Sequence, residues 1–158
     1  MPTAWTVLLG AAGALSGLLA GASVDQSVKQ LPARNRMGMR AFSSYTQAAD
    51  LGNGRFLYPL LGVGGAVLTC AAAIWALILS LPTGRLLPVI AAGVLSVAHS
   101  VTTARAAPIM WSQMKAKDDE ASLALIFRAF ARWQALRMVL QVATFGVIVY
   151  ALALNGDR

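Results

Sequence analysis

One face of a long apolar stretch carries the residues best suited to chemistry. His99 is the only histidine of the chain, and Ser96, Ser100 and Thr103 stand at helical spacing around it, so the four share one face of a helix. An ionisable group at membrane depth is a candidate functional residue, and loss of water favours the neutral imidazole. We predict that His99 contacts a ligand, as a base if the protein is an enzyme. The alternative is a histidine that only joins helices, by hydrogen bonding to Gln141 or a hydroxyl.

Two further apolar stretches carry polar stripes at helical spacing that could face His99. Polar side chains in contact with lipid are costly, so these stripes should turn toward the protein interior. Together they predict a pocket for a lipophilic small molecule. The predicted pocket residues are Tyr58, Thr69, Ser96, Ser100, Thr103, Arg137 and Gln141.

A second group of polar residues lies where the apolar stretches meet polar sequence. An acid, a base and a phenol above an apolar cavity would suit an acidic or phenolic small molecule. Salt bridges within the group are the alternative. The predicted residues of this cytoplasmic mouth are Asp25, Asp50, Asn53, Arg55 and Arg105, with Tyr58 and Arg137 beside them.

Four apolar runs are long enough to cross a membrane. They cover about residues 5–24, 56–81, 86–109 and 133–154, and each reaches the roughly 20 residues that a transmembrane helix needs. The chain is 58% hydrophobic and 12% charged, with a mean hydropathy of +0.65, whereas soluble domains carry about 25% charged residues. We predict one all-α membrane domain, residues 1–158, with four antiparallel transmembrane helices in a bundle.

The basic residues are unevenly distributed between the connections. Eleven of the thirteen lysines and arginines lie between the first two runs, or between and just inside the last two. This asymmetry is typical of cytoplasmic connections, so both termini should lie outside the cell membrane. The positions of the charges indicate membrane lipids as partners, and they argue against nucleic acid as the reason for the net charge of +7.

The first connection should contain an amphipathic helix. Pro32 is expected to interrupt the first helix, and the glycines at positions 52 and 54 to turn the chain before the second run. Residues 33–51 are too polar to span, and a helix with arginines on its wet face can lie in the membrane interface. Its expected apolar face consists of Ala41, Phe42, Tyr45, Ala48 and Ala49.

Glycines in the first run predict close helix packing. Gly13, Gly17 and Gly21 follow one another at four-residue spacing, and in lipid such small residues let helix backbones approach. Packing inside the bundle is the first interpretation, and a homo-oligomer interface is the alternative. Trp5 and Trp111 lie near the ends of runs, where tryptophan favours the membrane interface.

The sequence gives no indication of a metal site or a cofactor. The lone Cys70 allows no internal disulfide, and no cysteines and histidines stand at metal-ligand spacing. A single histidine cannot provide two axial ligands to haem. The first run has no basic residue before it, so we expect an uncleaved helix and not a signal peptide.

The layout and one segment of the last helix resemble a known family. Residues 130–137, FARWQALR, are similar to the aromatic and arginine-bearing start of the last helix in the anthrone-oxygenase-like family of small membrane proteins. The resemblance implies four short spans and, for some members, cofactor-free oxygenation of anthrones to anthraquinones. It assigns no catalytic residue. The function classes left open are such an enzyme, a binder or transporter of small molecules, and a structural membrane subunit.

Overall fold

Helices make up nearly the whole chain. A computed structural model describes residues 3–117 and 119–156, and no strand occurs among them. The elements are α1 (Thr3–Asp25), the π-helical turn η1 (Gln26–Gln30), α2 (Leu31–Met37), α3 (Met39–Ala48), the π-helical turn η2 (Ala49–Asn53), α4 (Gly54–Ile78), α5 (Thr83–Ala116) and α6 (Glu120–Gly156). The predicted all-α fold is confirmed.

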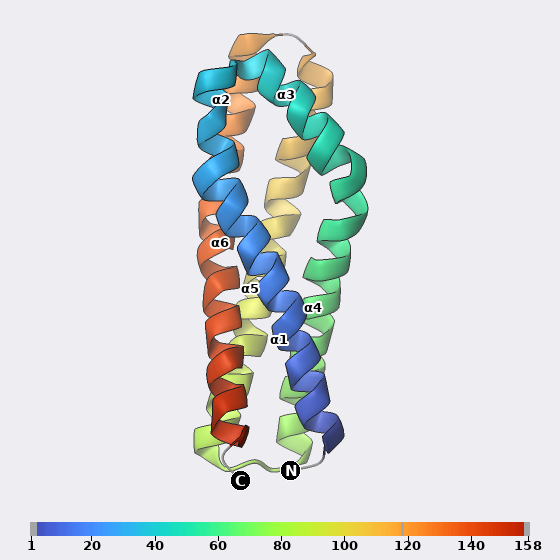
Figure 1. The fold of residues 1–158 in the computed structure, drawn as a ribbon, viewed down its shortest axis with the longest axis vertical. Helices are drawn as coiled ribbons and strands as arrows, with labels where there is room; N and C mark the ends of the chain where they lie inside the picture. Colours follow the sequence, from blue (N-terminus) through green and yellow to red (C-terminus); the bar gives the residue numbers. More distant parts are fainter. Residues whose placement is uncertain (1–2, 118, 157–158) are drawn as a thin grey trace.

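Four long helices lie side by side (Figure 1). α1 contacts α4 and α6, and α5 contacts the same two helices, so each long helix packs against two neighbours. α1 begins and α6 ends at the lower end in Figure 1, whereas α2, α3 and the connection between α5 and α6 form the upper end. The space enclosed by the four helices is therefore covered at the upper end by α2 and α3.

The helices are long and apolar enough to cross a membrane. The four candidate spans are Thr3–Met37, Met39–Ile78, Thr83–Ala116 and Glu120–Asn155. At 1.5 Å per residue, helices of this length reach about 50 Å and exceed a hydrocarbon core of about 30 Å. The predicted run 56–81 extends beyond α4, which ends at Ile78.

Pro32 does not interrupt the first helix, so that prediction was wrong. The chain continues from α1 through η1 into α2, with Pro32 in the first turn of α2. The helix accommodates the proline directly after a π-helical turn, in which the backbone N–H of Leu31 bonds to the carbonyl oxygen of Gln26. The break comes at Gly38, where φ is +86°, a value that glycine adopts at little cost. Gln26 thus follows α1 without a break.

The glycines that were expected to turn the chain lie within or next to a helical turn instead. η2 joins α3 to α4 and ends at Asn53, with Gly54 as the first residue of α4. A Cβ at position 54 would lie 2.8 Å from Cε2 of Tyr58 and 3.0 Å from the carbonyl oxygen of Ala49. Gly54 is therefore required for the close approach of Tyr58 to the backbone, and not for a change of direction.

The buried face of α3 differs from the predicted one. Tyr45 is 41% exposed, and the buried residues are Phe42, Ser43 and Thr46. Ser43 and Thr46 donate hydrogen bonds of 3.0 and 2.8 Å to Oε1 of Gln113 in α5. These bonds allow two hydroxyls to be buried, and apolar periodicity alone could not show them.

Two of the three predicted packing glycines contact a neighbouring helix. A Cβ at Gly13 would lie 3.2 Å from Ile148, and one at Gly17 would lie 2.8 Å from Phe145, both in α6. Gly21 has nothing within 4 Å, which corrects its assignment to this face. Each step of four residues advances about 40° around a helix, so Gly21 has rotated away from α6. The contact with α6 thus uses Gly13 and Gly17 for packing inside the bundle.

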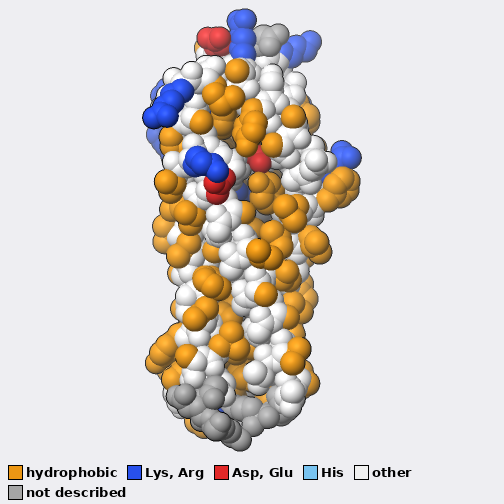
Figure 2. All heavy atoms as spheres, viewed as in Figure 1, with side chains coloured by type: hydrophobic (Ala, Val, Ile, Leu, Met, Phe, Trp, Pro, Cys, Tyr) orange, Lys and Arg blue, Asp and Glu red, His pale blue; other side chains and the backbone are white. Residues whose placement is uncertain are grey.

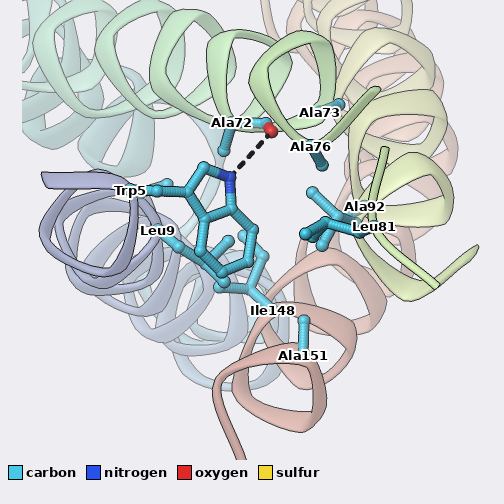
Figure 3. Close-up of a cluster of buried hydrophobic side chains, with 11 residues drawn as sticks. Trp5, Leu9, Ala72, Ala73, Ala76, Leu81, Ala92, Ile148 and Ala151 are labelled. Carbon is cyan, nitrogen blue, oxygen red and sulfur yellow. Dashed lines mark hydrogen bonds between the residues drawn. The ribbon is translucent and has the colours of Figure 1, made fainter. Parts of the chain in front are cut away.

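An apolar cluster fills the lower half of the interior. It surrounds Trp5, which is fully buried, and the expected interfacial position of this side chain is wrong. Figure 3 shows the indole between α1, α4 and α6, with its N–H donating a 3.3 Å hydrogen bond to the carbonyl oxygen of Ala72. Small residues of α4 and α5, among them Ala76 and Ala92, pack around the same ring. This cluster closes the interior below the polar residues described next.

Candidate functional site

A cavity of about 290 Å³ lies between α1, η2, α4, α5 and α6. The π-helical turns contribute directly to it, because Gln26 of η1 and Asp50 and Leu51 of η2 are in its wall. Apolar atoms provide most of its wall, and the apolar residues and glycines in it are Leu19, Ala22, Leu51, Gly54, Pro59, Gly62, Val63, Ala107, Met110, Trp111 and Phe130. The polar residues that reach it are Ser23, Gln26, Asp50, Arg55, Tyr58, His99, Ser100, Thr103, Arg137 and Gln141.

Four polar side chains in the cavity wall form a chain of hydrogen bonds. Arg137 donates from Nη2 to Oε1 of Gln26 over 3.0 Å, and Gln26 donates from Nε2 to Oδ2 of Asp50 over 3.0 Å. The hydroxyl of Tyr58 donates to Oδ1 of Asp50 over 3.2 Å. α1–η1, η2, α4 and α6 each contribute one member, so this chain ties four segments together at one level.

Arg137 keeps hydrogen-bonding capacity that the protein does not use. Its Nε is buried and has no partner, and no carboxylate of residues 3–117 or 119–156 forms an ion pair with it. The ring of Phe130 lies 5.9 Å from the guanidinium carbon. A guanidinium has five N–H donors, so Arg137 can donate to a molecule in the cavity while it holds Gln26.

His99 lies at the floor of the cavity. Its Nε2 is 3.4 Å from the hydroxyl oxygen of Ser96, and its Nδ1 is buried without a partner. Below it, a small void is bordered by Ser16 and Thr144 among others. Gln141 borders the same void, and its amide oxygen accepts from the hydroxyl of Ser23. Ser96 and His99 both belong to α5, so this contact does not join two helices, and one ring nitrogen of His99 has no partner.

Many of the predicted site residues line the cavity. Tyr58, Ser100, Thr103, Arg137 and Gln141 from the predicted pocket line it, as do His99 and two predicted mouth residues, Asp50 and Arg55. The guanidinium of Arg55 is exposed and stacks over the ring of Phe56 at 4.7 Å. Ser100 and Thr103 donate to backbone carbonyls of Ser96 and His99, which leaves their oxygen atoms as acceptors toward the cavity.

Other predicted site residues do not line the cavity. Thr69 is fully buried and donates to the carbonyl oxygen of Gly65, and Ser96 contacts His99 without lining the cavity. Asp25 is paired with Lys29 and Gln30 on the surface. Asn53 and Arg105 are exposed and do not line the cavity. Being near a helix end does not fix which way a side chain points.

Sequence reasoning missed Gln26 and gave Ser23 no role in the site. Both lie on the α1 face that also carries Ser16, at spacings of seven and three residues, which is a helical stripe. Gln134 of α6 strengthens this side, because it donates to the carbonyl oxygen of Ser23 and to the hydroxyl of Ser27. The stripe could have been found only by continuing the first helix beyond Asp25.

The connection between α5 and α6 carries an acidic cap. Asp119 accepts a 3.1 Å hydrogen bond from the backbone N–H of Ala121 and a 2.5 Å bond from the hydroxyl of Ser122. The hydrogen bond from the Ser122 hydroxyl lowers the pKa of Asp119 below its usual value, and the backbone N–H groups of Ala121 and Ser122 add to this effect. An ionised Asp119 at the start of α6 suits the helix dipole and fixes the helix that carries Arg137.

The described residues offer no group of three or more His, Cys, Asp or Glu side chains that could hold a metal ion. No protein-family model, curated protein or solved structure matches the chain. The expected likeness to the anthrone-oxygenase-like family therefore has no support from these comparisons. What the structure defines is a chain of four long apolar helices around a mainly apolar cavity with an arginine and a histidine in its wall.

Proposed function

We propose that the chain is a multi-pass membrane protein that binds a lipophilic small molecule in the cavity between its helices. The observation that carries this proposal is the lining of the cavity, which is mainly apolar yet includes two residues, Arg137 and His99, that each have a buried nitrogen atom without a partner. A purely structural polar group is normally satisfied by the protein. The volume of the cavity, about 290 Å³, is close to the lower end of the range for ligand pockets, roughly 300 Å³.

The proposed orientation places both termini outside the cell membrane. On the face in Figure 2, charged side chains gather at the upper end, and the rest of the face is largely hydrophobic. The upper end holds α2, α3 and the connection between α5 and α6, and eleven of the thirteen basic residues lie in the stretches 29–55 and 105–137 that lead into and out of this end. We therefore assign this end to the cytoplasm on the bias of lysine and arginine.

Cysteine labelling tests the orientation. In a Cys70→Ala background, Ser44→Cys in α3 should react with an impermeant thiol reagent only from the cytoplasmic side, and Asn155→Cys in α6 only from the outside. Both positions lie at opposite ends of the molecule because α3 and the end of α6 do. Labelling of position 155 from the cytoplasmic side alone would reverse the proposed topology.

A cavity-filling variant tests ligand binding. Gly62 lines the cavity, and a Cβ there would meet only Leu19, at 3.9 Å, so Gly62→Phe should fold and occupy the binding space. We expect native mass spectrometry of the purified protein to find a retained small molecule in the wild type. Its occupancy should fall about tenfold in Gly62→Phe, equivalent to about 1.4 kcal/mol.

The matched control is Gly146→Phe. Gly146 lies on α6 with nothing within 4 Å of a Cβ, so the same substitution adds a ring without touching the cavity. Equal retention by wild type, Gly62→Phe and Gly146→Phe would show that the molecule sits elsewhere, and the proposed binding site would be refuted.

An enzymatic role is the second candidate, and His99 is the observation in its favour. Nδ1 of His99 has no partner and the residue borders the cavity, so a neutral imidazole there could take a proton from a bound carbon acid or phenol. Cofactor-free oxygenation of an anthrone, which the family resemblance implies, needs such a base before oxygen adds. Anthrone is therefore the probe for this candidate, with formation of anthraquinone as the measurement.

A further inference from the structure

Arg137 is an enclosed cation whose nearest acid is kept at a distance. Gln26 stands between Arg137 and Asp50, accepting from one and donating to the other over 3.0 Å each. Within the described chain Arg137 forms no ion pair, and its Nε has no acceptor. A charge taken out of water is costly unless it is paired, so the position favours an anion supplied from outside the chain.

Asp50 does not compete for that position. Each of its carboxylate oxygens already accepts one hydrogen bond, Oδ2 from Gln26 and Oδ1 from Tyr58. The amide of Gln26 is in turn engaged at both its oxygen and its nitrogen, which fixes its orientation between the two charges. Asp50 is satisfied without contacting Arg137, and the guanidinium remains available to the cavity.

The cavity wall limits both the charge and the shape of a bound molecule. Arg55 adds a second, exposed cation at the edge of the cavity, whereas Asp50 adds an acid inside it. One enclosed guanidinium suits one negative charge, and a dianion would be repelled by Asp50. Most of the remaining wall surface is apolar, with Leu19, Val63 and Met110 among its residues, and this part suits a hydrocarbon chain or ring.

We infer that the ligand of this cavity is an amphiphile with a single carboxylate, held by Arg137, and an apolar body that lies along the wall formed by α1, α4 and α5. The inference rests on the proposed function and specifies its ligand class. A carboxylate matches the planar, forked arrangement of guanidinium donors, and Arg137 lines the cavity with a single hydrogen bond to the protein, from Nη2 to Gln26. The polar headgroup points to the level of Gln26, and the apolar body lies where the wall has no charge.

Binding of radiolabelled dodecanoate tests the inference. The full chain is placed in phosphatidylcholine nanodiscs, and binding is compared with dodecanol and dodecylamine after subtraction of empty nanodiscs. We expect saturable binding of dodecanoate and an affinity at least about tenfold lower for the alcohol and the amine, which corresponds to about 1.4 kcal/mol. Equal affinity for acid and alcohol would overturn the inference, as would a preference for the amine.

Two arginine variants on the same helix assign the headgroup site. Arg137→Gln should lower dodecanoate affinity at least about tenfold and remove the preference for acid over alcohol. Arg132→Gln, at an exposed position of α6, should bind like the wild type. Full acid preference in Arg137→Gln would contradict the assignment. If that variant does not fold, Arg137→Lys keeps the charge, and it should preserve the preference for the acid at reduced affinity.

The same measurements separate this inference from the proposed function. If dodecanol binds as well as dodecanoate and Gly62→Phe abolishes both, the cavity binds lipophilic molecules and the carboxylate assignment is wrong. If dodecanoate binds equally well to Gly62→Phe and to Gly146→Phe, the acid lies outside the cavity and the inference is wrong. Retention of a small molecule in native mass spectrometry then decides the proposed function independently.

Discussion

His99→Gln should reduce the conversion of anthrone to anthraquinone by about 100-fold or more, the usual contribution of a general base, without unfolding the protein. Glutamine can still contact the hydroxyl of Ser96, which now lies 3.4 Å from Nε2 of His99, but it cannot take up a proton. Absorbance of anthraquinone in air-saturated buffer, with protein in nanodiscs, measures the rate. The uncatalysed oxidation of anthrone in empty nanodiscs is subtracted.

The reaction needs only a base and dioxygen. The imidazole takes a proton from the carbon opposite the carbonyl group of anthrone, and the carbanion adds dioxygen to give a peroxide anion. The imidazolium returns the proton to form a hydroperoxide, which loses water and leaves the second carbonyl. Anthrone and dioxygen thus give anthraquinone and water, with dioxygen as the oxidant. We assign the proton transfer to Nδ1 of His99, which has no protein partner; this assignment requires the tautomer in which Nε2 carries the hydrogen and donates to Ser96.

His99→Leu separates catalysis from packing. If His99 is the base, the leucine and glutamine variants should fold and lose turnover alike. If His99 only joins helices, the glutamine variant should match the wild type and the leucine variant should lose thermal stability alone. A glutamine variant with full turnover would remove the base from the mechanism and leave the binding function as the sole candidate.

The helices could be predicted because hydropathy and length act over many residues. Four runs of roughly 20 apolar residues define four spans, and errors of one or two turns at each end do not change that result. The π-helical turns η1 and η2 depend on a few backbone hydrogen bonds around Gln26 and Ala49. No composition signal marks such turns, so the sequence predicted a break at Pro32 where the structure has a continuous helix.

The cavity was predictable where helical spacing alone decides the direction of a side chain. His99, Ser100 and Thr103 lie on one face, and all three reach the cavity. Asp25 and Gln26 show the limit, because adjacent residues point about 100° apart on a helix. Asp25 faces the surface and Gln26 faces the cavity. The packing of α1 against α6 decides which of the two residues faces the cavity, and the spacing of residues alone does not predict that packing.

Phe127→Ala is expected to cost about 3–5 kcal/mol of stability, the usual range for a buried aromatic residue. Phe127 is fully buried at the upper end, and its ring meets that of Phe42 edge-on with centroids 4.9 Å apart. Leu123 and Phe130 of α6 complete the cluster that holds α3. Thermal unfolding followed by tryptophan fluorescence should show a midpoint several degrees lower than in the wild type.

Leu125→Ala provides the control on the same helix. Leu125 is 63% exposed, and substitutions at exposed sites usually change stability by no more than about 0.5 kcal/mol. If Phe127→Ala and Leu125→Ala unfold at the same temperature, the ring of Phe127 does not anchor α3 and the cluster has been misinterpreted.

The packing of Phe127 against α3 should also affect the cavity, because α3 leads directly into η2. η2 carries Asp50, whose carboxylate accepts from Gln26 and Tyr58 and so positions the partner of Arg137. Loosening α3 should disturb this chain of hydrogen bonds, although Phe127 does not line the cavity. We therefore expect Phe127→Ala to reduce dodecanoate binding even below its unfolding temperature, whereas Phe127→Leu, which refills most of the space, should restore it. Undiminished binding in Phe127→Ala would show that η2 holds Asp50 without support from α3.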